Sequence, residues 1–141
     1  MADATVTAAN VQPVTTGTSK TVYGKGTSAA TVTAGQALYK NSSGTWGLAD
    51  ADSSATTAGL NGVGVALNGG ASGQPLEIAT SGEYDPGFTA TEGVIYVLSG
   101  TAGGIAPSAD LATGDWVTIL GVGNSSGNID LICKYFGSQV Q

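Results

Sequence analysis

Thr33-Ala-Gly-Gln-Ala-Leu-Tyr39 and Thr91-Glu-Gly-Val-Ile-Tyr-Val97 fall on each other when the sequence is shifted by 58 residues. Both stretches run from a turn signal into an apolar segment of strand length. The likeness continues downstream with small gaps, where Gly64-Val-Ala66 corresponds to Gly121-Val-Gly123. Such repetition is typical of a pseudo-symmetric β structure made of two similar units. The alternative is that a Gly-, Ser- and Ala-rich chain aligns with itself by composition alone.

Composition favours strands over helices. The 141 residues include 23 glycines, and only 10% of the residues are charged, so the long polar residues that favour helices are scarce. The hydrophobic fraction is 41%, and glycines separate apolar runs instead of clustering, which argues against disorder beyond about residue 18. One β domain of ordinary size is therefore expected.

Nine segments read as strands because each is an apolar or β-branched run bounded by Gly, Asn, Ser or Pro. They are Thr21–Lys25, Gln36–Lys40, Thr45–Ala49, Gly62–Leu67, Pro75–Thr80, Val94–Leu98, Gly103–Ala106, Asp115–Gly123 and Asn128–Phe136. The only candidate helical turn lies between Asp52 and Ala58. If the repeat is real, Leu38 and Tyr96 should face comparable environments in the two units.

The expected fold is all-β, a small β-sandwich or barrel-like fold of two similar four-stranded halves with an extended N-terminal arm. Residues 1–18 form the arm and residues 19–141 the β domain, with pseudo-repeats at about 31–82 and 89–136. The arm has few large apolar side chains, so we expect it to be mobile in the free protein and dispensable for thermal stability. Its Val6, Val11 and Val14 are the candidate anchors to the strand edge of a partner.

Catalytic chemistry has few residues to use. The chain contains no histidine and no arginine, which removes the commonest general base and the usual bidentate anion clamp. Glu83 and Asp85 could form an acid pair, but Asp85-Pro-Gly87 is also a common turn sequence. Asp50 and Asp52 resemble the start of a calcium loop that lacks its later ligands. We therefore predict a protein that is not an enzyme and has no cofactor or metal site.

Several short motifs have structural interpretations. Cys133 has no partner for an intrachain disulfide and lies in an apolar run, which predicts a buried, unreactive thiol. Asn41-Ser-Ser43 and Asn124-Ser-Ser126 match the glycosylation pattern but are interpreted as hairpin turns. Trp46 and Trp116 are expected to pack in the core.

Charge and hydropathy limit the class of partner. The net charge is −6 and the four lysines are scattered, which argues against nucleic-acid binding. No apolar run reaches the roughly 18 residues of a membrane span, and the N-terminus does not have the pattern of a secretion signal. We therefore expect neither a nucleic-acid nor a membrane partner.

Two longer stretches resemble small β-rich virion proteins of tailed bacteriophages, namely head decoration (cement) proteins and modules at the base of head fibres. One is Ala58–Gly82, with Gly62-Val-Gly-Val-Ala-Leu67. The other is Tyr96–Val122, with Asp110-Leu-Ala-Thr-Gly-Asp-Trp-Val-Thr118. The likeness covers roughly residues 30–136.

The resemblance implies a structural protein, made in the host cytoplasm, that binds the major capsid protein on the outer surface of the head, often as a homotrimer, and stabilises the head. The family supplies no catalytic residues that map onto this chain. The alternative is a fibre or fibre-base module that binds a host-surface receptor or carbohydrate. That function requires aromatic side chains at loop tips, for which Tyr23, Tyr84 and Trp46 are the candidates.

Overall fold

The computed structural model describes residues 3–141 and is built from antiparallel strands. The described part contains no α-helix, only the 3-10 turns η1 (Ala8–Asn10) and η2 (Ser108–Asp110). The strands are β1 Val11–Pro13, β2 Val22–Thr27, β3 Ala37–Lys40, β4 Trp46–Leu48, β5 Val63–Ala66, β6 Pro75–Pro86, β7 Ile95–Leu98, β8 Ile105–Pro107, β9 Trp116–Gly123 and β10 Ile129–Gln139. The all-β prediction is confirmed, and each of the nine expected strands overlaps an observed one.

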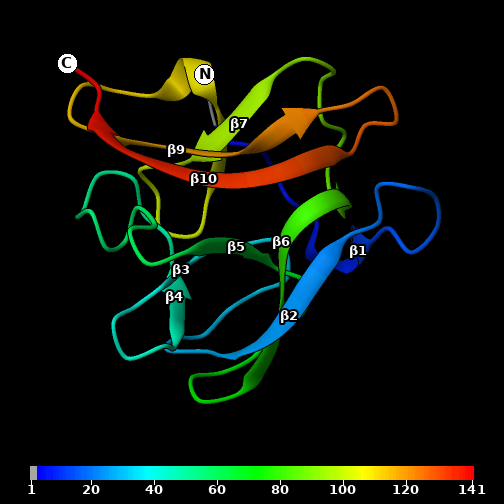
Figure 1. Ribbon diagram of the computed structural model, residues 1–141, viewed down its shortest axis with the longest axis horizontal. Helices are drawn as coiled ribbons and strands as arrows, with labels where there is room; N and C mark the ends of the chain where they lie inside the picture. Colours follow the sequence, from blue (N-terminus) through cyan, green and yellow to red (C-terminus); the bar gives the residue numbers. More distant parts are fainter. Residues whose placement is uncertain (1–2) are drawn as a thin grey trace.

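Eight of these strands form one strongly curled sheet, a half-barrel, in the order β4-β3-β5-β6-β10-β9-β7-β8. Figure 1 shows β7, β9 and β10 on one side of the molecule and β3, β4 and β5 on the other, with β6 between them. Strands β1 and β2 pair with the other edge of β6. The long, bent β6 therefore joins the two layers into one sheet.

Strand β6 changes its neighbours near Gly82. Its first part pairs with β2 and β5, and its last part pairs with β1 and β10. Gly82 has a φ of +80°, and a Cβ at this position would overlap the carbonyl group of Lys20. Only glycine combines this backbone conformation with so close an approach of a neighbouring chain. The bend in the sheet thus depends on this residue.

The strand order is the same on both sides of the central β6-β10 pair. Moving outward, β5, β3 and β4 follow β6, whereas β9, β7 and β8 follow β10. Strands at corresponding places in the two sequence repeats thus have corresponding places in the sheet. Leu38 lies opposite Gly64, and Tyr96 lies opposite Gly121.

The expectation of comparable environments for Leu38 and Tyr96 is nevertheless wrong. Tyr96 packs in the large core cluster, whereas Leu38 packs in a smaller cluster with Val32 and Leu76. On β3 it is Ala37 that reaches the large cluster, while Ile95 of β7 is exposed. Successive side chains of a strand point to opposite faces, and on β3 both faces are buried, so Ala37 and Leu38 pack in different clusters.

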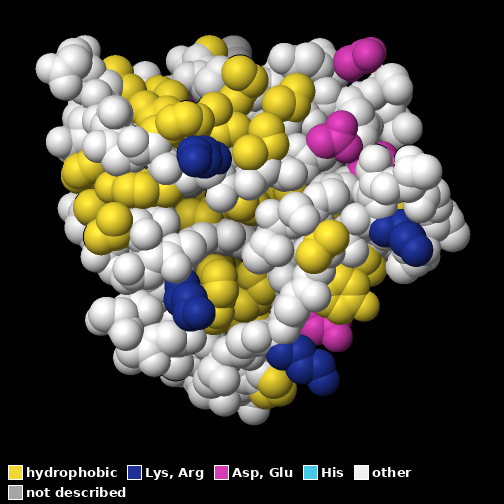
Figure 2. Space-filling view, viewed as in Figure 1, with side chains coloured by type: hydrophobic (Ala, Val, Ile, Leu, Met, Phe, Trp, Pro, Cys, Tyr) yellow, Lys and Arg dark blue, Asp and Glu magenta, His cyan; other side chains and the backbone are white. Residues whose placement is uncertain are grey.

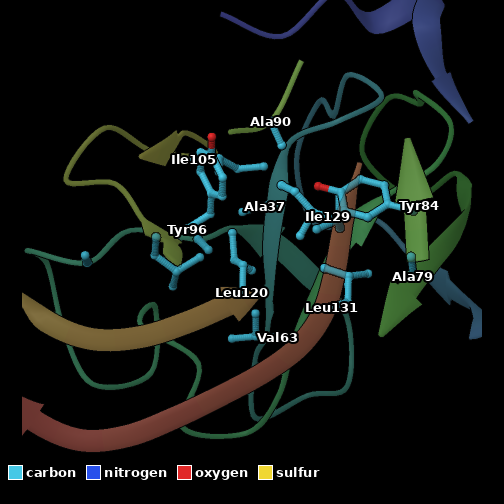
Figure 3. Packing of buried hydrophobic residues seen from close by; sticks show 14 residues of the cluster. Ala37, Val63, Ala79, Tyr84, Ala90, Tyr96, Ile105, Leu120, Ile129 and Leu131 are labelled. Carbon is cyan, nitrogen blue, oxygen red and sulfur yellow. The ribbon is translucent and has the colours of Figure 1, made fainter. Parts of the chain in front are cut away.

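The large cluster fills the space enclosed by the curled sheet. It combines side chains from both repeats, including Val63, Tyr84, Leu120 and Ile129 (Figure 3). Tyr84 is fully buried, and its hydroxyl has no hydrogen-bond partner among the described residues. Because the cluster draws on both repeats, neither repeat would bury its apolar face alone.

The two Asn-Ser-Ser sequences form matching hairpin turns. Asn41 Oδ1 accepts hydrogen bonds from the amides of Ser43 and Thr45 in the β3-β4 turn. Asn124 Oδ1 accepts hydrogen bonds from the amides of Ser126 and Asn128 in the β9-β10 turn. The side chain thus replaces a backbone acceptor, as expected of asparagine in tight turns. The hairpin interpretation of both motifs is confirmed.

The N-terminal segment lies against the β domain. In strand β1, Val11 pairs with Pro86 of β6. Before this strand, the amide of Thr7 donates to the carbonyl of Gly87, and the amide of Ala4 donates to the carbonyl of Ile105. Of the mobile arm expected over residues 1–18, residues 1–2 lie outside the described residues, and the segment 4–14 pairs with or packs against the β domain. The expectation of a mobile arm rested on the few apolar side chains of residues 1–18, which are too few to offset the entropy lost on ordering. It left out the unpaired strand edges elsewhere in the same chain, with which this segment can pair.

Cys133 lies at an irregularity in β10, where the pairing with β9 shifts between Leu131 and Lys134. It has a φ of +52° and packs against the large cluster. Burial raises the pKa of its thiol from 9.0 to about 12, and burial also raises the pKa of the Tyr84 hydroxyl. Cys133 is partly rather than fully buried, and a thiol that stays protonated at neutral pH is a poor nucleophile.

These shifts predict that the protein loses stability between about pH 9 and pH 12. The unfolded chain releases the Cys133 proton near 9.0, whereas the folded chain keeps it until about 12, so raising the pH favours unfolding. In the wild type, the Cys133 thiol should lower the free energy of unfolding by up to about 1.4 kcal/mol for each pH unit in this range. Cys133→Ala should lack this contribution, so its stability should fall less steeply with pH. Denaturant melts across this range test it. Equal slopes for the variant and the wild type would show that the thiol ionises in the folded protein.

Candidate interaction surfaces

The acidic residues singled out in the sequence are engaged in local structure. The side chain of Glu83 accepts hydrogen bonds from the side-chain amides of Asn124 and Asn128, at 3.0 and 2.9 Å. Asp85 Oδ1 accepts a hydrogen bond from the amide of Gly87, which forms the expected turn at the end of β6. Glu83 and Asp85 thus each hold a loop in place, and neither is paired with the other.

The Asp50 region is also a turn. The amide of Asp52 donates to Asp50 Oδ1, and the hydroxyl of Thr57 donates to the Asp50 carbonyl. Burial raises the pKa of the Asp50 carboxyl, and the hydrogen bond with the Asp52 side chain adds to the effect. Within residues 3–141, no group of three or more His, Cys, Asp or Glu side chains is placed to hold a metal ion.

The three valines proposed as partner anchors contact their own chain. Val11 is buried, and Val6 and Val11 lie over Gly35 and Gly87, where a Cβ would meet their methyl groups. Val14 exchanges backbone and side-chain hydrogen bonds with Thr21. These three residues therefore make contacts within the protein. Candidate surfaces for partner binding lie elsewhere.

One layer of the sheet carries exposed apolar side chains on its outer side. Ile95 of β7 pairs with Val122 of β9, and Ile132 and Phe136 follow on β10, with exposures of 39% for Ile95, 55% for Ile132 and 51% for Phe136. Figure 2 shows apolar side chains gathered over β9 and β10 around a single basic group. We call the surface formed by Ile95, Val122, Ile132 and Phe136 the β10 face.

A second exposed feature is the edge of β2. This strand pairs with β6 on one side only, and no other strand of the described chain pairs with it. Val22 and Tyr23 are exposed at 55% and 48%. Lys25, in the same strand, is the kind of residue that protects an edge against uncontrolled pairing.

A polar hollow of about 340 Å³ lies where β1, the end of β6 and the β9-β10 turn meet. We call it the Asp85 hollow. Its lining consists of Asn10, Gln12, Asp85, Gly87, Phe88, Thr89, Ser126, Gly127 and Asn128. The N-terminal segment is thus part of its wall, which sequence reasoning did not anticipate.

The aromatic residues proposed for receptor binding are distributed differently from the expectation. Tyr84 is fully buried and Trp46 packs against the smaller core cluster, so neither lies at an exposed loop tip. Tyr23 is exposed, but it lies in strand β2. Trp116 is partly buried and packs against Tyr135, with ring centroids 6.1 Å apart.

Comparison with known proteins finds no family model that matches the sequence and no curated protein that is similar to it. In residues 3–141 there is also no helix that is long and apolar enough to cross a membrane.

The β10 face was missed at the level of sequence, although a signal was present. In Ile129-Asp-Leu-Ile-Cys-Lys-Tyr-Phe136 apolar residues occupy both alternating positions of the strand. A strand with one face in water normally alternates apolar and polar residues. The lack of alternation was interpreted only as burial, whereas it also fits a strand with one core face and one face that binds a partner.

Proposed function

We propose that this protein is a structural component of a bacteriophage virion that binds the outer surface of the capsid and stabilises it. The observation that carries the proposal is the β10 face, an apolar surface on a fold whose core is already complete. Contiguous apolar surface on the outside of a closed fold typically marks a binding site for another protein. The resemblance to head decoration proteins supplies the partner, the major capsid protein.

The shape and charge of the molecule support the same role. Each end strand of the eight-strand order is contacted by another segment, since the Ala4 amide donates to the Ile105 carbonyl in β8 and the Ala29 amide donates to the Trp46 carbonyl in β4, and this limits uncontrolled pairing at these two edges. The chain is acidic and carries four lysines, which does not suit binding to the packaged nucleic acid. On the head we expect several copies to assemble, and we propose a homotrimer with two similar four-stranded halves in each copy.

Replacing Ile132 and Phe136 with aspartate should abolish attachment to heads. Both side chains are more than half exposed, so the fold should tolerate the change while the apolar contact is lost. Central apolar residues of an interface contribute about 2–4 kcal/mol each, so affinity should fall by at least about 30-fold. The measurement is cosedimentation of purified protein with heads that lack it.

Tyr23→Asp is the control, because it places one carboxylate on a comparably exposed strand residue away from the β10 face. It should leave attachment unchanged. If Tyr23→Asp abolishes attachment and the double variant does not, the capsid contact is at the β2 edge. If neither protein nor variants bind heads at any concentration, the decoration role is wrong.

The second candidate function is a fibre or fibre-base module that binds a host-surface receptor or carbohydrate. The Asp85 hollow is the observation that favours it, because its lining is rich in amides and hydroxyls. The two functions differ in what the protein binds first. Decoration predicts binding to bare heads, and the receptor module predicts binding to host cells in the absence of heads.

A further inference from the structure

The Asp85 hollow is built by residues far apart in the sequence. Asn10 and Gln12 come from the N-terminal segment, Asp85 from the end of β6, and Ser126 and Asn128 from the β9-β10 turn. Its volume of about 340 Å³ is at the small end of the roughly 300–1,000 Å³ typical of small-molecule sites. It is thus large enough for a small ligand and too small for a folded partner.

Polar groups around the hollow have unused hydrogen-bonding capacity. Within residues 3–141, no hydrogen bond engages the side chains of Asn10, Gln12 and Thr89, the hydroxyl of Ser126, Asp85 Oδ2 or Asn128 Oδ1. The asparagines of the turns elsewhere are used internally, as Asn41 is in the β3-β4 turn. The free donors and acceptors at the hollow are therefore available to a ligand.

Two of these groups are held in fixed orientations. Asp85 Oδ1 accepts the amide of Gly87 at 3.0 Å, which directs the carboxylate while leaving Oδ2 free. Asn128 donates to Glu83 Oε2 at 2.9 Å, which leaves its carbonyl oxygen free. Side chains already held in a binding geometry lose less entropy when a ligand arrives.

The chemistry of the lining selects the ligand. Adjacent carboxylate, amide and hydroxyl groups can donate to and accept from neighbouring hydroxyls of the same molecule. No lining residue is basic, and Asp85 and nearby Glu83 would repel an anion. Phe88 also lines the hollow, but its ring packs toward Tyr96 and the large cluster, so the hollow is mainly polar. We propose that the Asp85 hollow binds a neutral sugar ring, a hexopyranose presented at the end of a glycan.

The test is an amide-resonance titration of the full chain with neutral monosaccharides and, in parallel, with sialic acid and glucuronic acid. Glucose, galactose, mannose and N-acetylglucosamine form the neutral set. At least one neutral sugar should shift the amides of residues 10–12, 85, 87–89 and 126–128, while the two acidic sugars should not. Asp85→Asn should weaken that binding by at least about tenfold. Glu77→Gln, which removes a carboxylate from an outer position of β6, should leave it unchanged.

Three results would overturn the proposal. They are the absence of shifts with every neutral sugar, shifts confined to residues outside the hollow, and equal affinity of wild type and Asp85→Asn. Binding of the acidic sugars alone would also show that the assigned ligand class is wrong. Sugar binding does not depend on the decoration role, and cosedimentation of Asp85→Asn with heads separates the two. That variant should still bind heads if decoration is correct, whatever the titration shows.

Discussion

Deleting residues 2–16 should lower the melting temperature of the protein by about 10 °C. The deletion removes β1, which covers the edge of β6 from Tyr84 to Pro86, and it exposes the site where Val11 is buried. Loss of one buried valine costs about 1.5–3 kcal/mol, and each lost backbone hydrogen bond about 1 kcal/mol. A net loss of about 3 kcal/mol corresponds to this shift for a chain of this size. Differential scanning calorimetry measures it.

A single substitution tests the same contact without shortening the chain. Val11→Asp places a carboxylate in the buried position over Gly35 and Gly87, and it should destabilise the protein by about 3 kcal/mol or more. Gln12→Asn changes the exposed neighbouring position of β1 without placing a charge opposite Asp85, and it should have little effect on stability. If the truncated protein and Val11→Asp both melt with the wild type, the N-terminal segment is a mobile arm, and its valines are again free to bind a partner.

Gly82→Ala should be among the most destabilising single substitutions in the chain, with an expected loss of about 3 kcal/mol or more. The left-handed backbone at φ +80° disfavours any L side chain by about 1–2 kcal/mol. The new Cβ would in addition overlap the Lys20 carbonyl, which belongs to the backbone and can move only if the loop before β2 moves. Urea unfolding of the purified variant measures the loss.

Gly73→Ala and Gly93→Ala separate the two contributions. Both glycines have similar φ values, +87° and +81°, but a Cβ at either position would meet nothing within 4 Å. They should therefore cost only the conformational strain, about 1–2 kcal/mol. If Gly82→Ala is no worse than these two controls, the approach of Lys20 to β6 is not a constraint, and the bend of β6 does not require glycine.

The candidate site was less accessible to sequence reasoning than the strands were. The β10 face combines residues of three strands, with Ile95 and Phe136 41 positions apart, and the Asp85 hollow joins the first dozen residues to the last twenty. A pattern within a short stretch of sequence cannot predict that residues so far apart become neighbours in space. Of the three valines proposed as anchors to the strand edge of a partner, Val11 lies in a strand that pairs with β6 of the same chain.

The sequence by itself determined the local structure of this protein. Strand positions, the two asparagine hairpin turns and the absence of long helices follow from interactions between residues only a few positions apart, and the sequence specifies such interactions directly. Only the tertiary structure decided which face of each strand is buried, where the N-terminal segment pairs and which surfaces remain open. Those outcomes depend on competition between distant segments for the same edges and the same core. Leu38 and Tyr96, which correspond in the sequence repeat, are both buried but pack in different core clusters.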